Sequence, residues 1–310
     1  MRIIALLKEK GVTFFLNQVF RKLSFFREVF PELKFCSNIS QHVNVVNLGS
    51  TAALHNFAYP SIAKIRYDNW ALPVQSLYYD WAILSQYGSF LEENATIVLP
   101  LCPFDACTTD KTSELIRKRY NTFLHPVIIP CSDNLDRSKY LRFNEHPIFY
   151  IKEVYGTKKM LFKICLERPL SWAVRHIKGD YIHKDAISRI HDWKKQFDTV
   201  DLNAPLSNEC SKSMQFNQII MKKICDFCKN HDFNLGVVLL PVSQSLRSQF
   251  PSNFQENYIT PLLEIVKNEG FAIMDYWETN KFAEDANFRD AINLKREYAE
   301  AFTKEIITKL

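Results

Sequence analysis

The sequence predicts an α/β protein, a three-layer sandwich in which helices cover both faces of a mostly parallel, five-stranded sheet. Two observations predict this fold. Short apolar segments rich in β-branched residues alternate with amphipathic helical segments, which is the order that a parallel sheet requires. In addition, 47% of the 310 residues are hydrophobic, enough for a substantial core in one large or two modest domains.

Each expected strand is a short apolar run. The first is VNVVNL at 43–48, the second lies within 62–70, and the third is ATIVLPL at 95–101, an uninterrupted run typical of parallel sheets. The fourth and fifth strands follow much later, at 235–242 and 271–276. Right-handed crossovers between these strands would place helices on both faces of the sheet.

Helical segments separate and follow these strands. Apolar residues recur at helical spacing in 76–87, 211–231 and 256–270, and Pro261 is expected to break or kink the last of these. The sequence closes on an amphipathic helix at 297–310. Strands and helices thus alternate as a three-layer sandwich requires.

Residues 1–40 are predicted to form an amphipathic helix and a linker before the α/β domain of residues 41–310. The apolar residues of 12–30 fall on one helical face, with basic residues elsewhere. Such a helix either packs against the domain or lies in a membrane interface. Because no run is long enough to span a membrane and no secretory signal is evident, we expect a cytoplasmic protein whose membrane contact, if any, is peripheral and on the inner face.

A large insertion is expected at about 103–211, between the third and fourth strands. Insertions at the carboxyl edge of such sheets usually form lids or partner surfaces. We therefore expect this segment to cover the site and to control what reaches it.

Composition argues against several classes of partner. The formal charge of +5 is small and dispersed, and no nucleic-acid motif is present, so no nucleic-acid partner is expected.

The eight cysteines are scattered, as in a protein with reduced thiols. Cys225 and Cys228 form a CxxC before His231 but lack a second ligand pair, so we interpret them as buried apolar residues. No metal and no cofactor is predicted.

The first strand ends at Gly49. Ser50 follows it and directly precedes an expected helix, TAALHNF. A strand that breaks at a glycine and presents a serine is how α/β sheets expose a nucleophile or bind an anion. Near the end of the sequence, FRDAINL at 288–294 precedes the last helix. These two blocks resemble the first and last blocks of the SGNH (GDSL) hydrolase superfamily, whose sandwich is flavodoxin-like.

A narrower resemblance covers much of 43–310. The NLGS sequence, the run at 69–101 and the ending at 274–306 look like the SGNH-like proteins of bacterial capsule and exopolysaccharide loci. The resemblance implies an ester hydrolase or acyltransferase, in which a serine attacks an acyl carbonyl and a histidine takes its proton.

The resemblance assigns roles to individual positions. Ser50 matches the nucleophile and Asp290 matches the triad acid, but Asn293 occupies the position of the histidine base. An amide has no proton affinity near neutral pH, so Asn293 cannot act as the base.

The oxyanion-binding positions also differ from the family pattern. Besides Gly49, Val74 lies near the place of the family's glycine, where its backbone N–H could still donate. Cys102 follows the third strand, where the family has an asparagine. Loss of that side-chain donor costs on the order of 2.7 to 4 kcal/mol if nothing replaces it.

Two interpretations of the site stay open, together with a simpler one. A histidine elsewhere could serve as the base, with His176 and His183 of the insertion the first to test; the candidates are His55, His125, His176, His183 and His191. Otherwise the chain is a catalytically inactive protein that uses the hydrolase fold for binding or scaffolding. In the simpler view, Ser50 is only a helix N-cap and Asp290 caps the last helix.

The expected function is therefore action on, or recognition of, an acyl-ester (O-acetyl-type) group on a sugar, in surface-polysaccharide biosynthesis or modification. The expected partner is a sugar or an acylated small-molecule or polysaccharide ligand. One alternative is a catalytically inactive binding or scaffold protein. A glycosyl or nucleotide-sugar transferase ranks last, because the sequence has neither a glycine-rich phosphate loop nor a DxD-type metal motif.

Overall fold

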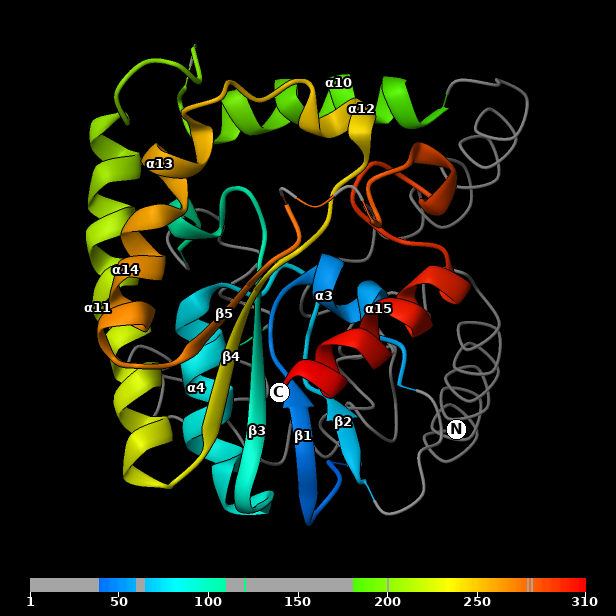
Figure 1. Ribbon diagram of the computed structural model, residues 1–310. Helices are drawn as coiled ribbons and strands as arrows, with labels where there is room; N and C mark the ends of the chain where they lie inside the picture. The colour runs from blue at the N-terminus through cyan, green and yellow to red at the C-terminus, as the bar shows by residue number, and fades with distance from the viewer. Residues whose placement is uncertain are drawn as a thin grey trace, which may run out of the picture. The chain divides into compact units, whose positions relative to one another are not determined.

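Five parallel strands form the centre of the described structure, in the order β2-β1-β3-β4-β5 (Figure 1). The computed structural model describes residues 39–59, 65–109, 120, 181–199, 201–277, 279 and 281–310. The strands are β1 (Val43–Asn47), β2 (Tyr67–Asn69), β3 (Leu91–Leu101), β4 (Asn234–Leu239) and β5 (Ala272–Asp275). Every pairing among them is parallel, which confirms the predicted sheet.

Strand β3 begins earlier than the apolar pattern predicts, at Leu91 instead of residue 95. Its first residues include the polar sequence Glu92-Glu93-Asn94, which carries no strand signal. Asn94 has a φ of 58°, and the register between β1 and β3 shifts between Val43 and Val45. Backbone pairing with β1 therefore extends β3 beyond the residues whose side chains are buried.

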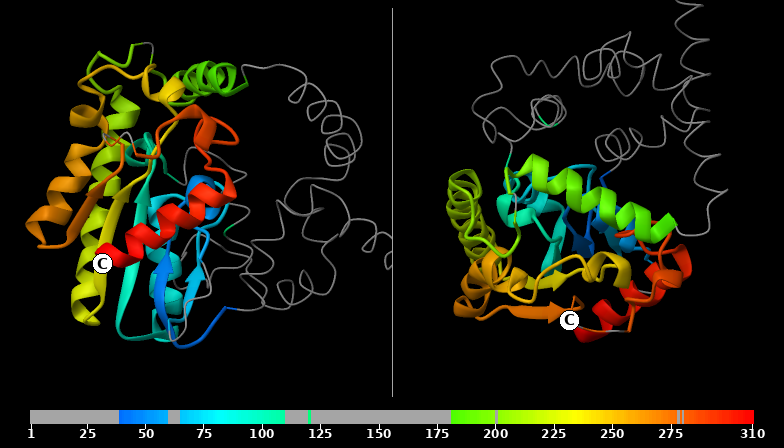
Figure 2. Two further views of the ribbon diagram at one scale, coloured as in Figure 1. Left: turned by 45° about the vertical axis from the view of Figure 1, so that its right-hand side comes forward. Right: turned by 90° about the horizontal axis from the view of Figure 1, so that it is seen from above.

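Helices cover both faces of the sheet, as the views in Figures 1 and 2 show. On one face, α3 (Thr51–Asn56) and α15 (Arg296–Lys309) share a core with the sheet, in which Val45, Val98 and Val238 pack with Phe302. On the other face lie α4 (Leu77–Tyr87) and α11 (Asn208–Asn230), which contact each other. This arrangement is the predicted three-layer sandwich.

The expected helix at 256–270 is two helices. They are α13 (Phe254–Tyr258) and α14 (Thr260–Asn268), and the chain bends between them at Ile259, whose φ is −123°. Pro261 lies in the first turn of α14. A proline there removes no helical hydrogen bond, so the predicted break is confirmed and Pro261 begins a new helix instead of kinking an old one.

Helix α10 (Tyr181–Gln196) crosses the carboxyl edge of the sheet and packs against α12 (Gln244–Arg247), as Figure 1 and the view from above in Figure 2 show. Ala186 and Ile190 are its buried residues. The ring of Phe104, just after β3, stacks on that of Phe197 at 5.0 Å. Aromatic packing thus ties the chain after α10 to the carboxyl end of β3.

Residues 40–113 and 180–310 form one compact unit, which contains the sheet and α10. Only parts of the insertion expected at 103–211 fall within the described ranges. The N-terminal helix expected in residues 1–40, with its membrane alternative at 12–30, lies outside them. Among the helices of the described ranges, none is long and apolar enough to cross a membrane.

Candidate functional site

The turn after β1 breaks the strand at Gly49 and is followed by a helix, as the sequence predicts. Gly49 has a φ of +107°, and a Cβ atom there would lie 2.8 Å from Cβ of Ala53. Ser50 follows as the N-cap of α3, but its side chain makes no capping hydrogen bond. Its hydroxyl instead faces the Cys102 thiol, at 3.8 Å between Oγ and Sγ. Ser50 thus occupies a cap position without using its hydroxyl as a cap.

The buried carboxyl group of Asp80 stabilises this turn. Asp80 of α4 accepts hydrogen bonds at Oδ1 from the Gly49 N–H at 2.7 Å and from Nε2 of Gln75 at 2.5 Å. Burial raises the pKa of Asp80 to about 7, although both hydrogen bonds oppose the rise. Asp80 therefore holds the backbone of the turn that carries Ser50.

A second carboxyl group, Asp105, lies beside Cys102. Its Oδ2 accepts the Cys102 N–H at 2.7 Å, and its side chain also hydrogen-bonds the Cys102 thiol. Burial, with repulsion from Asp80, raises the pKa of Asp105 to about 7. Burial also raises the pKa of Cys102 well above its ordinary value, with Asp105 as the next cause. Cys102 is therefore a neutral thiol, and in its contact with the Ser50 hydroxyl either group can be the donor.

The Val74 backbone N–H, expected near the oxyanion position, already donates a hydrogen bond within the protein. Its N–H donates to Oγ1 of Thr51 at 3.2 Å. Val74 has a φ of +61°, a conformation that suits glycine and strains a β-branched residue. The side chain is 41% exposed, so packing does little to compensate for this strain.

Asp290 and Asn293 lie together in the loop before α15. The Asn293 amide group donates to both carboxylate oxygens of Asp290, at 3.0 Å to Oδ1 and 2.8 Å to Oδ2. The Asn293 N–H also donates to Oδ1, at 3.0 Å. Asn293 is buried, and its Oδ1 has no hydrogen-bond partner among the described residues. Asn293 therefore donates to both oxygens of the Asp290 carboxylate and fixes its orientation.

Helix α10 supplies a cation to the same carboxylate. Nη2 of Arg189 lies 3.5 Å from Oδ1 of Asp290, and its Nε donates to Oδ2 of Asp185 at 2.6 Å. The same oxygen of Asp185 accepts the Ala291 N–H at 2.9 Å. The positive charge of Arg189 also acts on Cys102, where it lowers the thiol pKa slightly against the larger effect of burial. Arg189 thus links α10 to both parts of the site.

Sequence reasoning did not identify Asp80, Asp105, Asp185 or Arg189. The only local signal was the spacing of Asp185 and Arg189, four residues apart on a helix, which is typical of a surface ion pair. Nothing in the sequence around Asp80 or Asp105 indicates that either carboxyl group is buried.

The described histidines do not supply a base to Ser50. His55 is exposed on α3, yet surrounding protein desolvates its ring enough to lower its pKa to about 4, with Arg289 adding to the effect and Asp290 opposing it. His183 and His191 are exposed on α10. Among the described residues, the hydrogen-bonding partner of the Ser50 hydroxyl is the Cys102 thiol and not an imidazole. His125 and His176 lie outside these residues.

The site thus combines a strained serine turn with groups that mainly donate hydrogen bonds. Arg189 and Asn293 have donors, and the carboxyl groups of Asp80 and Asp105 already accept backbone N–H groups. Such a set can bind an oxygen-rich ligand, but among the described residues no group is placed like the base of a serine triad.

The sequence matches no family model, and no curated protein matches it. It is similar to a solved structure described as "a putative platelet activating factor from Streptococcus pneumonia", with 9% sequence identity and a TM-score of 0.40. That similarity covers 99% of this chain and 98% of the other. The function is therefore inferred from the residues of the site.

Proposed function

We propose that this protein is an SGNH-like α/β protein that recognises an acyl-ester (O-acetyl-type) group on a sugar, by binding instead of triad hydrolysis. The observation that carries the proposal is the surroundings of Asp290. Its carboxylate contacts Asn293 and Arg189, which donate hydrogen bonds and cannot take a proton from Ser50. The assignment to surface-polysaccharide biosynthesis or modification rests on the sequence resemblance.

The preserved turn supports a ligand site at Ser50. Gly49 keeps a conformation that places Ser50 at the carboxyl edge of the sheet, where ligands of open α/β sheets bind. The Ser50 hydroxyl can donate to an ester carbonyl or accept from a sugar hydroxyl. Arg189 adds a fixed positive charge close to Cys102, which favours an oxygen-rich ligand.

One observation favours a second candidate function, slow ester hydrolysis or acyl transfer at Ser50. Asp105 hydrogen-bonds the Cys102 thiol, and that thiol faces the Ser50 hydroxyl. With a pKa of about 7, Asp105 is partly ionised at neutral pH. A proton from Ser50 could therefore reach a carboxylate through Cys102, without a histidine.

Binding of an O-acetylated oligosaccharide, compared with the same oligosaccharide after deacetylation, tests the first function. We expect tighter binding of the acetylated form by titration calorimetry, and loss of that preference in Ser50→Ala and Arg189→Gln. Arg296→Gln, on the exposed surface of α15, is the matched control and should bind like the wild type. Equal affinity for the two forms in the wild type would contradict ester recognition.

Turnover of an aryl acetate separates the two functions. The binding function predicts no turnover that depends on Ser50. Turnover that disappears in Ser50→Ala and in Asp105→Asn would replace it with the second function. Turnover that persists unchanged in Ser50→Ala would exclude Ser50 as the nucleophile.

A further inference from the structure

A pair of cysteine thiols lies outside the site described above. Cys107 ends the short 3₁₀ helix η2 (Asp105–Cys107), which follows β3, and Cys210 lies in the first turn of α11. The two thiols lie close enough to shift each other's pKa although 102 residues separate them in the sequence, and the Cys210 thiol donates to the carbonyl oxygen of Phe197 at 3.5 Å. Their side chains are buried, at 1% and 2% exposure, and both are free.

Backbone contacts hold the two cysteines together independently of their sulfur atoms. Nδ2 of Asn217, on α11, donates to the carbonyl oxygens of Asp105, Ala106 and Thr108 at 3.1, 2.8 and 2.9 Å. Asn217 is fully buried. The segment that carries Cys107 is therefore fixed against α11 before any bond forms between the thiols.

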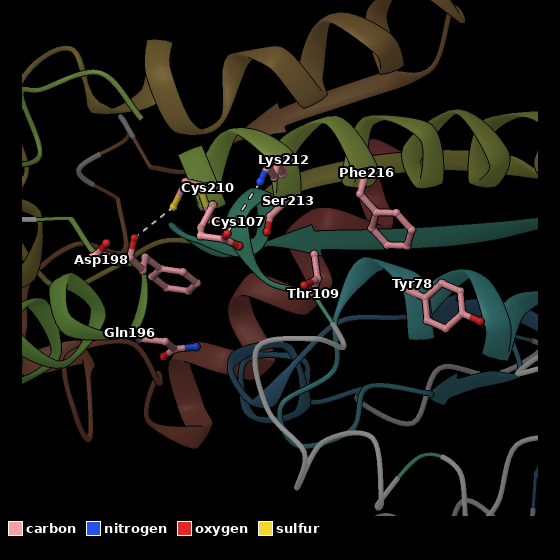
Figure 3. A pocket seen from close by; sticks show the side chains of 11 residues that line it. Tyr78, Cys107, Thr109, Gln196, Asp198, Cys210, Lys212, Ser213 and Phe216 are labelled. Carbon is pink, nitrogen blue, oxygen red and sulfur yellow. Dashed lines mark hydrogen bonds and ion pairs between the residues drawn. The ribbon is translucent and has the colours of Figure 1, made fainter. Parts of the chain in front are cut away.

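Both cysteines line a cavity of about 520 Å³ (Figure 3). Other lining residues include Tyr78, Thr109, Lys212 and Phe216. The volume is ample for a small reactant, because one water needs only about 30 Å³. Because both cysteines line this cavity, a small molecule inside it would lie next to them.

The surroundings of Cys210 distinguish it from the other described cysteines. The neighbouring Cys107 thiol lowers the pKa of Cys210 to about 7, against the opposing effect of burial. Its position at the start of a 23-residue helix also favours a negative charge. Burial instead raises the pKa of Cys225 and of Cys228 to about 12.

We propose that Cys107 and Cys210 form a redox-active thiol pair that a small hydroperoxide oxidises through the cavity. The Cys210 thiolate attacks the peroxide oxygen, the O–O bond breaks, and the leaving oxygen takes a proton to depart as water or an alcohol. The Cys107 sulfur then attacks the Cys210 sulfenic acid, a disulfide forms, and water leaves with the Cys107 proton. Two thiols are oxidised by two electrons, and one peroxide is reduced.

The pairing gives the oxidised protein a new link between the end of β3 and the start of α11. That link is two residues from Asp105, which contacts Cys102 in the candidate site. The inference does not depend on the function proposed for that site, because neither thiol of the pair belongs to it.

Peptide mapping of the full chain tests the proposal. After brief treatment with hydrogen peroxide and blocking of the remaining thiols, mass spectrometry should find one disulfide-linked pair of peptides, containing Cys107 and Cys210. The link should form equally in the control variant Cys228→Ser, whose thiol is buried away from the cavity. A link between other cysteines, or no link between these two, would overturn the proposal.

Two single variants test the order of the steps. In Cys107→Ser, Cys210 should stop at a sulfenic acid that a dimedone probe labels, whereas in Cys210→Ser no label should appear at Cys107. In the wild type, the rate of alkylation at Cys210 should rise through pH 7, as its thiolate forms. Labelling of Cys107 in Cys210→Ser would reverse the assigned roles, and alkylation of Cys210 no faster than that of Cys228 would refute its activation.

Discussion

Nη2 of Arg189 lies 3.5 Å from Oδ1 of Asp290, so a cation from α10 contacts a carboxylate in the loop before α15. Arg189 also pairs with Asp185 on its own helix, and Asp185 accepts the Ala291 N–H. Helix α10 and the loop before α15 are thereby joined by two carboxylates that share one guanidinium group.

Replacement of Arg189 by glutamine should destabilise the protein. The change leaves Asp185 and Asp290 without their shared cation, and hydrogen bonds to charged groups contribute about 1.5 to 3 kcal/mol. We expect the free energy of unfolding to fall by about 1 to 3 kcal/mol in urea titrations. Arg296→Gln is the control, because its pair with Glu300 is exposed and should contribute about 0.5 kcal/mol or less. Equal effects of the two substitutions would show that α10 does not depend on Arg189.

Replacement of Asn293 by histidine should create esterase activity. An imidazole at this position can accept a proton, and the Asp290 carboxylate is already oriented toward the side chain there. We expect aryl acetate turnover that is absent from Asn293→Ala and that increases as pH rises through the histidine pKa. The double variant Asn293→His with Ser50→Ala should be inactive, and activity that survives in it would mean that Ser50 is not the nucleophile.

Stability should decrease as pH rises from about 4 to about 7. The ordinary pKa of Asp80 and Asp105 is 3.8, and burial raises both to about 7. Between these values the folded protein keeps protons that the unfolded chain has released, so the free energy of unfolding falls with rising pH. Each unit of pKa shift corresponds to about 1.4 kcal/mol, which makes the combined effect several kcal/mol at most.

Substitution of Asp80 isolates its share of this pH dependence. Asp80→Asn keeps an acceptor for the Gly49 N–H but cannot ionise, so it should flatten the profile and raise stability above pH 7 relative to the wild type. Asp80→Ala, the matched control, leaves that N–H without its acceptor and should lower stability at every pH. A wild-type slope retained in Asp80→Asn would contradict the raised pKa of Asp80.

Alanine at Gly49 should cost more stability than alanine at Gly270. Both glycines have a positive φ, +107° and +79°, so both substitutions strain the backbone. A Cβ at Gly49 would also lie 2.8 Å from Cβ of Ala53, whereas a Cβ at Gly270 would have nothing within 4 Å. We expect a loss of about 1 kcal/mol for Gly270→Ala and at least twice that for Gly49→Ala, measured by urea unfolding. Similar losses would show that the Ser50 turn relaxes to admit a side chain.

The sequence by itself determined the elements whose side chains repeat with a period. Apolar runs indicated all five strands and the central parts of the helices, because burial on a sheet or a helix face selects residues at regular intervals. The pattern failed where pairing depends on the backbone alone, as at Glu92 and Glu93 of β3. The turn at Gly49 and Ser50 was also predictable, since a glycine with a positive φ is a local requirement.

Only the tertiary structure decided which polar groups meet. Asp80, Asp105 and Arg189 come from different segments, and their roles depend on burial and on partners far away in the sequence. The same holds for Cys107 and Cys210, which the sequence shows only as two scattered cysteines. A local pattern records which apolar side chains face the core, but the burial and the pKa of a carboxyl or thiol group depend on the groups that the folded chain places around it.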